Sequence, residues 1–152
     1  TPQIDDPVEF LIWGYRDLLE IGADKFALAI RILSEQSNVP AVFHCAAGKD
    51  RTGVLAALIF SLVGVPNEYI CADYGLTKRA IERTIAWAKE HHSDIAKRWT
   101  DINPVYLAAE PEAMRVILDD ISVAHGSVAN YVRSLGVTDA EIASLSALLL
   151  EQ

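Results

Sequence analysis

Residues 41–60 read AVFHCAAGKDRTGVLAALIF, and this stretch organises the 152-residue chain. The run Ala41–His44 predicts a short β-strand, and the residues from Thr52 to about Val63, which are apolar nearly all round, predict a buried helix. A polar loop with glycines at positions 48 and 53 joins them. Such a loop directs backbone N–H groups and a helix N-terminus at one point, which favours the binding of an oxyanion.

The loop carries a cysteine, Cys45, six positions before an arginine, Arg51. A helix N-terminus and neighbouring cations favour the thiolate form of a cysteine, so we expect a nucleophile at Cys45. The planar guanidinium of Arg51 can hold two oxygens of a phosphate group. The Thr52 hydroxyl is expected to donate to the thiolate, and His44 is expected to orient the loop through hydrogen bonds. The loop positions expected to contact a phosphate group are Ala46, Ala47, Gly48, Lys49 and Arg51.

Each of these residues has a simpler explanation when it is taken alone. Cys45 could be a small core residue, and Asp50 and Arg51 could form a surface ion pair. The conjunction of a histidine, a cysteine, two glycines and the run Lys49–Thr52 between a strand and a helix is much harder to obtain by chance. We therefore predict phosphate-ester chemistry through a cysteinyl-phosphate that water hydrolyses.

The composition indicates one domain over residues 1–152, because 51% of the residues are hydrophobic. A formal net charge of −8 argues against nucleic acid or an anionic membrane surface as a partner. No apolar stretch reaches the roughly 18 residues that a membrane span needs, and no signal-peptide pattern is present. Two distant cysteines do not form a disulfide framework, which favours a reducing, cytoplasmic location and leaves secreted use open.

No metal or cofactor is expected from the remaining histidines and cysteine. His91 and His92 are adjacent, so on a helix their side chains point in different directions, and no third ligand is apparent. Cys71 could pair with Cys45 under oxidation, but a helical cysteine between Ile70 and Ala72 is more often a packed core residue.

The rest of the chain is rich in predicted helices. Asp6 followed by Pro7 is a typical helix start, and Thr138 with Glu141 forms a capping box. The main predicted helices are 6–22, 24–35, 66–75, 78–92, 110–126, 127–135 and 138–149. Only one strand is convincing, and a lone strand cannot satisfy its backbone groups. We therefore expect a helix-rich α/β fold whose parallel sheet is completed by residues upstream of Thr1 or by a second chain.

The loop resembles the signature HCxxGxxR(S/T)G of the cysteine-dependent protein tyrosine phosphatase superfamily. Its HCxxGKDRTG form is similar to an atypical bacterial and fungal branch of that superfamily, typified by a mycobacterial enzyme. The resemblance continues through Val65–Thr77, Tyr106–Ala109, Gly126–Ser127, Tyr131 and Gly136. The chain is therefore similar to the C-terminal part of a longer family pattern.

The resemblance implies a phosphatase with Cys45 as nucleophile and Arg51 as phosphate binder. It also implies that Lys49 contacts further phosphates, as in phosphoinositide-directed relatives. The movable acid loop of the family would lie upstream of Thr1, so Asp50 becomes the candidate general acid, although its neighbour Arg51 favours a structural ion pair. The expected substrate is a phosphorylated protein bearing phosphotyrosine, with phosphoserine, phosphothreonine or a phosphoinositide as further options.

Two alternatives stay open at this point. The first is a phosphopeptide-binding module that does not catalyse, because the chain lacks the family's acid loop and most of its expected strands. The second is one part of a split enzyme that is active only with its N-terminal segment. The complete set of loop residues needed for thiolate chemistry argues for the enzyme.

Overall fold

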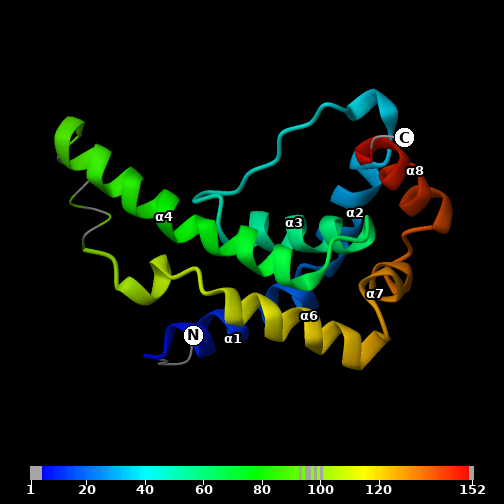
Figure 1. Cartoon of the computed structure of the whole chain (residues 1–152), viewed down its shortest axis with the longest axis horizontal. Helices are drawn as coiled ribbons and strands as arrows, with labels where there is room; N and C mark the ends of the chain where they lie inside the picture. The colour runs from blue at the N-terminus through cyan, green and yellow to red at the C-terminus, as the bar shows by residue number, and fades with distance from the viewer. Residues whose placement is uncertain (1–4, 93, 95–96, 98, 100, 151–152) are drawn as a thin grey trace.

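The computed structural model describes residues 5–92, 94, 97, 99 and 101–150. These residues form helices joined by short connections and one long extended segment (Figure 1). The elements in chain order are α1 (Pro7–Ile21), α2 (Ala23–Leu33), the 3₁₀ helix η1 (Gln36–Asn38), α3 (Asp50–Leu62), α4 (Asn67–His91), the 3₁₀ helix η2 (Pro104–Leu107), α6 (Pro111–His125), α7 (Val128–Ser134) and α8 (Asp139–Leu149).

The predicted α/β fold with a parallel sheet is wrong, because none of the described residues lies in a β-strand. Ala41–His44 is extended, as its sequence suggests, but its backbone groups bond to no other described strand. Figure 1 shows this segment as a separate cyan trace between η1 and α3. Val42 is 93% exposed. A β-rich run becomes a strand only when a neighbouring strand exchanges hydrogen bonds with it, and no described residue does so here.

The start of α1 follows the expected capping pattern. The Asp6 carboxylate accepts hydrogen bonds from the N–H groups of Val8 and Glu9 at 2.8 and 3.0 Å. Pro7 occupies the first turn, where a missing N–H costs nothing. The predicted helix start at Asp6 is confirmed, and it sets the direction in which α1 runs past the loop.

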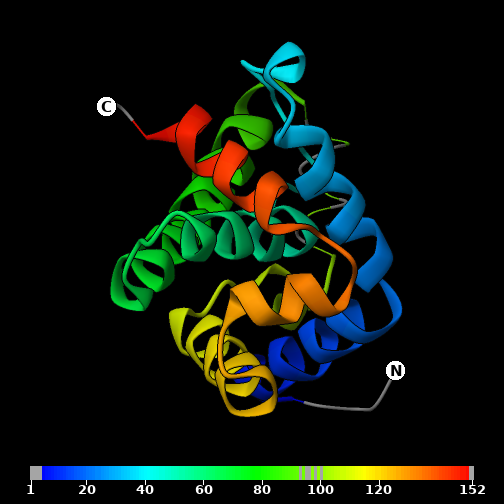
Figure 2. The ribbon, with the colours of Figure 1, turned by 90° about the vertical axis from the view of Figure 1, so that its right-hand side faces the viewer.

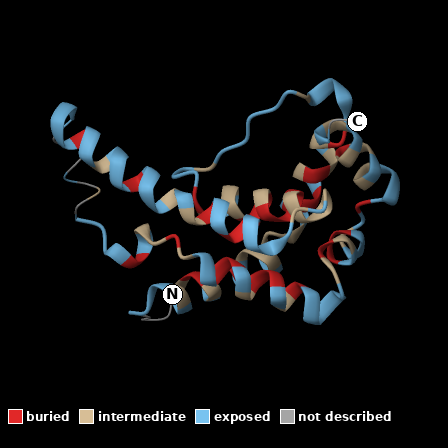
Figure 3. Cartoon of the chain, viewed as in Figure 1, coloured by how far each residue is buried: buried red, intermediate tan, exposed pale blue. Residues whose placement is uncertain are grey.

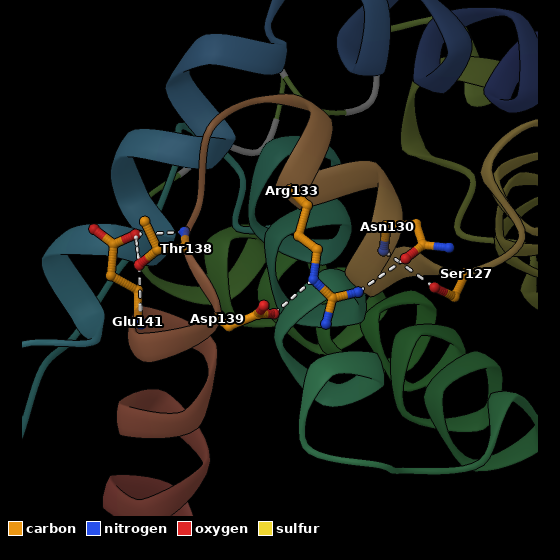
Figure 4. A network of polar contacts seen from close by, with 6 residues as sticks. All are labelled: Ser127, Asn130, Arg133, Thr138, Asp139 and Glu141. Carbon is orange, nitrogen blue, oxygen red and sulfur yellow. Dashed lines mark hydrogen bonds and ion pairs between the residues drawn. The ribbon is translucent and has the colours of Figure 1, made fainter.

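An ion pair links the C-terminal helices α7 and α8, and a side chain caps the N-terminus of each helix (Figure 4). The Ser127 hydroxyl caps α7, and Thr138 and Glu141 form the predicted capping box of α8. Arg133 of α7 donates to the Asp139 carboxylate at 2.7 Å, at the first residue of α8. At the N-terminus of each helix, a local side chain therefore accepts a hydrogen bond from an N–H group that has no partner within the helix, and the ion pair links the two helices.

The core forms where the apolar faces of the helices meet. Helix α6 packs against α1 and α4, and α3 lies next to α2, α4 and α7 in the middle of the molecule (Figure 2). The buried residues face inward along these helices, while the outer faces are exposed (Figure 3). The largest fully buried side chains include Tyr15, Leu11, Ile30, Leu58, Met114 and Leu145. This packing places the N-terminus of α3, and with it the loop, against α1 and α4.

Helix α4 is one continuous helix of 25 residues, where two helices separated near Gly75 were predicted. Gly75 does not end the helix. A Cβ at this position would lie 2.7 Å from Cγ of Pro111, so the glycine lets α4 approach the first turn of α6. Among the described residues no helix, α4 included, is both long enough and apolar enough to cross a bilayer.

Two helix glycines provide a matched test of this close approach. Gly75→Ala should lower the free energy of unfolding by about 1–3 kcal/mol, because the new methyl group would overlap Pro111. Gly14→Ala, inside α1 with no atom within 4 Å of the new Cβ, should raise it by about 0.5–1 kcal/mol through helix propensity. Urea unfolding of both variants measures the difference. Equal stabilisation by the two substitutions would contradict the tight contact.

Candidate active site

The loop joins the extended segment to the N-terminus of α3, which begins at Asp50. Gly48 has a φ of 65°, in the left-handed region that other residues adopt only with strain. Gly53 is needed for a different reason, since a Cβ there would lie 2.9 Å from the ring of Tyr74, and its absence allows α3 to pack closely on α4. Gly48 therefore allows the turn of the loop, and Gly53 allows α3 to pack closely on α4.

A cavity of about 220 Å³ opens beside Cys45. Cys45 and Arg51 both line it, although they come from opposite ends of the loop. Its walls are mainly apolar and include Leu18 of α1, Phe26 of α2 and Leu55 of α3. A thiol and a guanidinium in an apolar cavity suit a molecule that joins an apolar group to an oxyanion.

The Cys45 thiol is surrounded by hydrogen-bond donors. Partial burial by itself would raise the pKa of this thiol. The donor groups nearby, namely the Thr52 hydroxyl and the backbone N–H groups of Thr52, Lys49 and Gly48, outweigh burial and lower the pKa to about 6. At neutral pH Cys45 is therefore mostly the thiolate, which is the nucleophilic form of cysteine.

The Thr52 hydroxyl oxygen is buried and has no hydrogen-bond partner within ordinary distances among the described residues. Its interaction with Cys45 nevertheless lowers the pKa of the thiol. We interpret the Thr52 hydroxyl as a donor that bonds to the Cys45 thiolate more strongly than to the thiol.

Arg51 is the exposed cation of the loop. It forms no hydrogen bond or ion pair with any described residue, so the surface pair between Asp50 and Arg51 is absent from that part of the chain. The Asp50 carboxylate lies 3.0 Å from the Lys49 ammonium instead. The guanidinium of Arg51 therefore remains available to an anion in the cavity beside Cys45.

The Lys49 side chain points into the protein and is only 3% exposed. Its ammonium donates to the carbonyl oxygen of Ala108 at 2.8 Å and pairs with Asp50 Oδ1. In this position the ammonium lies away from the cavity that contains Cys45. Lys25 of α2, which our sequence reasoning missed, is the lysine that lines that cavity, and nothing in its local sequence distinguishes it from a solvated helix residue.

Two tyrosines outside the predicted site complete the surroundings of Asp50. Tyr15 of α1 donates to Asp50 Oδ1 at 2.9 Å, and its hydroxyl also shares a 2.5 Å hydrogen bond with the hydroxyl of Tyr74 on α4. Burial first, and the nearby Asp50 carboxylate after it, raise the pKa of both tyrosines, so both remain neutral. There was little indication of their role in the sequence, because each tyrosine lies on an apolar helix face. A buried hydroxyl there needs a hydrogen-bond partner, but the local sequence does not show which residue it is.

The remaining predicted loop residues lie at the surface. Ala46 and Ala47 are exposed bends of the loop. The His44 ring nitrogen Nδ1 lies 3.1 Å from the carbonyl oxygen of Cys45, which suits a residue that orients the loop rather than a base. The loop therefore presents small residues to solvent above the Cys45 cavity.

Cys71 and His91, which the sequence offered for a disulfide or a metal site, do not line the cavity beside Cys45. Cys71 is buried on α4 as a free thiol, and burial raises its pKa. His91 stacks on Trp87 with ring centroids 5.1 Å apart. Within the described part of the chain, no three histidine, cysteine or acidic side chains gather in a way that could hold a metal ion.

Alkylation by iodoacetamide tests the state of the Cys45 thiol. Because the thiolate is the reactive form, the rate should rise with pH to half its plateau near pH 6, the pKa of Cys45. Thr52→Val keeps the shape of the side chain and removes the donor, so the midpoint should move upward. Mass spectrometry distinguishes Cys45 from the buried Cys71, which should react slowly and at higher pH. A Cys45 midpoint above pH 8 would contradict the donor arrangement.

Comparison with known proteins agrees with this geometry. A family described as tyrosine phosphatases matches residues 2–151. The chain is 28% identical over 132 residues to a tyrosine-protein phosphatase of Nostoc commune, covering 82% of this chain and 44% of that protein. It is 28% identical over 124 residues to the triple specificity protein phosphatase PtpB of Mycobacterium tuberculosis, covering 73% and 44%. The chain thus spans less than half the length of these two curated relatives.

The match to the family description takes in almost the whole chain, including the Cys45 loop. The chain belongs to the tyrosine phosphatase family.

Proposed function

We propose that this chain carries the catalytic loop of a phosphatase that hydrolyses phosphotyrosine. The observation that supports it most directly is the pairing of a Cys45 thiol of pKa about 6 with an Arg51 that is unpaired among the described residues, both in one cavity. A low thiol pKa supplies a nucleophile at neutral pH, and a free guanidinium supplies a site for the phosphate oxygens. Either residue alone would serve packing or solubility equally well.

The reaction takes two steps. In the first, the Cys45 sulfur attacks phosphorus, the S–P bond forms and the bond from phosphorus to the phenolic oxygen breaks. The departing phenolate takes up a proton. In the second, water attacks phosphorus, the S–P bond breaks, inorganic phosphate leaves and the thiolate is restored. Arg51 would hold two equatorial oxygens throughout, and Thr52 would donate to the sulfur as it leaves.

The apolar walls of the cavity favour an aryl phosphate over an alkyl phosphate. Phe26 and Leu55 can pack on an aromatic ring whose phosphate lies between Cys45 and Arg51. Phosphoserine and phosphothreonine remain further options, in keeping with the name of the triple specificity relative. For a phosphoinositide, Lys25 is better placed than the buried Lys49 to meet an additional phosphate.

Asp50 is our candidate for the general acid, and its hydrogen bonds limit which of its two oxygens can carry the proton. Oδ1 already accepts from Tyr15 and from the Lys49 ammonium, whereas no described residue bonds to Oδ2, which is therefore the oxygen that would carry a proton to the leaving group. An Asp50 that acts as acid must therefore reach the substrate through Oδ2. If it does not act, the phenolate leaves without its help.

Substitution of the nucleophile tests the proposal as a whole. In the full-length protein, Cys45→Ser should lower p-nitrophenyl phosphate hydrolysis by at least about 1,000-fold, because a serine hydroxyl is not ionised near neutral pH. Cys71→Ser, on the same protein, should leave the rate within about twofold, since Cys71 lies outside the cavity. Vanadate should inhibit competitively. Binding of phosphopeptides without any turnover would replace the enzyme by the non-catalytic binding module.

Leaving-group dependence tests the role of Asp50. Asp50→Asn should slow phenyl phosphate, which has a poor leaving group, by about 100-fold or more, and slow p-nitrophenyl phosphate far less. The reason is that a basic phenolate needs a proton to depart and an activated one does not. Stopped-flow measurement of both substrates gives the comparison. An equal loss on the two would rule out Asp50 as the acid and leave it a structural partner of Lys49.

A further inference from the structure

We infer that Lys49 is a positioning residue: the Ala108 carbonyl and Asp50 bind its buried ammonium, Tyr15 and Tyr74 hold Asp50, and this anchor orients the loop backbone around Cys45. The inference rests on the proposed function, because it explains how that function's nucleophile is prepared. It concerns the side-chain anchor of the loop, whereas the roles of Cys45 and Arg51 concern the substrate.

Lys49 interacts with its surroundings through both its backbone N–H and its side-chain ammonium. Its backbone N–H is one of the groups that lower the pKa of the Cys45 thiol. Its side chain runs in the other direction and is buried, with the ammonium bonded to the Ala108 carbonyl at 2.8 Å and to Asp50 at 3.0 Å. Because the allowed rotamers of a side chain depend on the backbone torsions, holding the Lys49 side chain at its tip restricts the directions that its backbone N–H can take.

The Asp50 carboxylate is itself held from two helices. Tyr15 of α1 donates to it at 2.9 Å, and Tyr74 of α4 bonds to the Tyr15 hydroxyl. The two rings meet edge to face with centroids 6.1 Å apart, which fixes both hydroxyls. Glu110, ahead of α6, is the further acidic group that acts on Tyr74. Helices α1 and α4 and the connection at Ala108 therefore converge on two consecutive loop residues.

Stability alone is a poor explanation for this arrangement. Removing a charge from water costs several kcal/mol, and replacing a buried ion pair by apolar side chains of similar size is often neutral or stabilising. Loops are also normally placed at the surface with lysines in solvent. A buried lysine beside the nucleophile is instead what a loop needs when its backbone direction must not vary.

The charged and titratable groups that share the cavity with Cys45 are His44, Lys25 and Arg51. None of them bonds to Lys49, Asp50 or Tyr15 in the described residues. Tyr15→Phe and Tyr74→Phe therefore remove no hydrogen bond or ion pair of these cavity groups in the described part of the chain. Any shift in the titration of Cys45 then reports the direction of the backbone donors.

The test is the pH dependence of Cys45 alkylation by iodoacetamide in Tyr15→Phe. Loss of the Tyr15 hydroxyl frees Asp50 and loosens Lys49, so the midpoint should rise by about half to one pH unit, and the rate at pH 6 should fall about two- to fivefold. Tyr74→Phe should move the midpoint in the same direction by less, because Tyr74 reaches Asp50 only through Tyr15. Alkylation needs no turnover, so the measurement does not depend on activity.

Tyr131→Phe is the matched control. The Tyr131 hydroxyl is also bonded to α1, where it donates to the Leu19 carbonyl at 2.7 Å, but it lies outside the anchor. This variant should lose stability to a similar extent and keep the Cys45 midpoint of the unaltered protein. The comparison separates a specific effect on the loop from a general loosening of α1.

An unchanged midpoint in folded Tyr15→Phe, with circular dichroism equal to that of the unaltered protein, would overturn the inference. So would an equal shift in Tyr131→Phe. If Tyr15→Phe does not fold, Lys49→Met takes its place, because methionine fills the buried path without the ammonium and should raise the midpoint at least as far. A shifted midpoint in a protein that never hydrolyses aryl phosphates would support the anchor and contradict the proposed function.

Discussion

The Lys49 ammonium is buried at the start of α3, where it bonds to the Ala108 carbonyl and the Asp50 carboxylate. A charge in this position requires partners, and those partners require others in turn, since Asp50 also accepts from Tyr15 and Tyr15 bonds to Tyr74. The chain of bonds joins the loop to α1, to α4 and to the connection before α6. The loop is thereby connected to the packed core on the side away from the cavity.

Neutral dipoles stabilise the Cys45 thiolate, and the charged Arg51 side chain does not take part. The donors that lower the pKa of Cys45 are the Thr52 hydroxyl and nearby backbone N–H groups, all of them neutral. Dipoles at hydrogen-bond distance act over a short range and are little affected by salt, in contrast to exposed charges. The thiolate is thus stabilised without engaging Arg51, whose guanidinium stays unpaired with respect to the described residues. A cation left free in this way can bind an incoming oxyanion without first breaking an ion pair.

The scaffold that supports this loop is helical in every regular element that the described part of the chain forms. Helix α3 lies centrally against α2, α4 and α7, and glycines at its start and in α4 bring the helices close. On the other side of Cys45 the extended segment Ala41–His44 crosses without a β-strand partner among the described residues. After the nucleophile, the loop continues directly into a helix that is packed in the core.

The sequence by itself determined the family of the chain and the local starts of helices, and it predicted the chemistry of the loop. Gly48, the Asp6 cap and the Thr138 capping box depend on atoms within a few residues, so short-range rules predict them. The tertiary structure alone decided that Lys49 turns inward, that Gly75 continues a helix and that Ala41–His44 pairs with no described strand. Tyr15 and Tyr74 stand 35 and 24 positions from Asp50, and no local pattern records such contacts. Packing between distant segments sets the hydrogen-bond partners of buried polar groups and of extended backbone. The loop residues are consecutive, so the sequence could predict their chemistry, but it could not predict the anchor of Lys49.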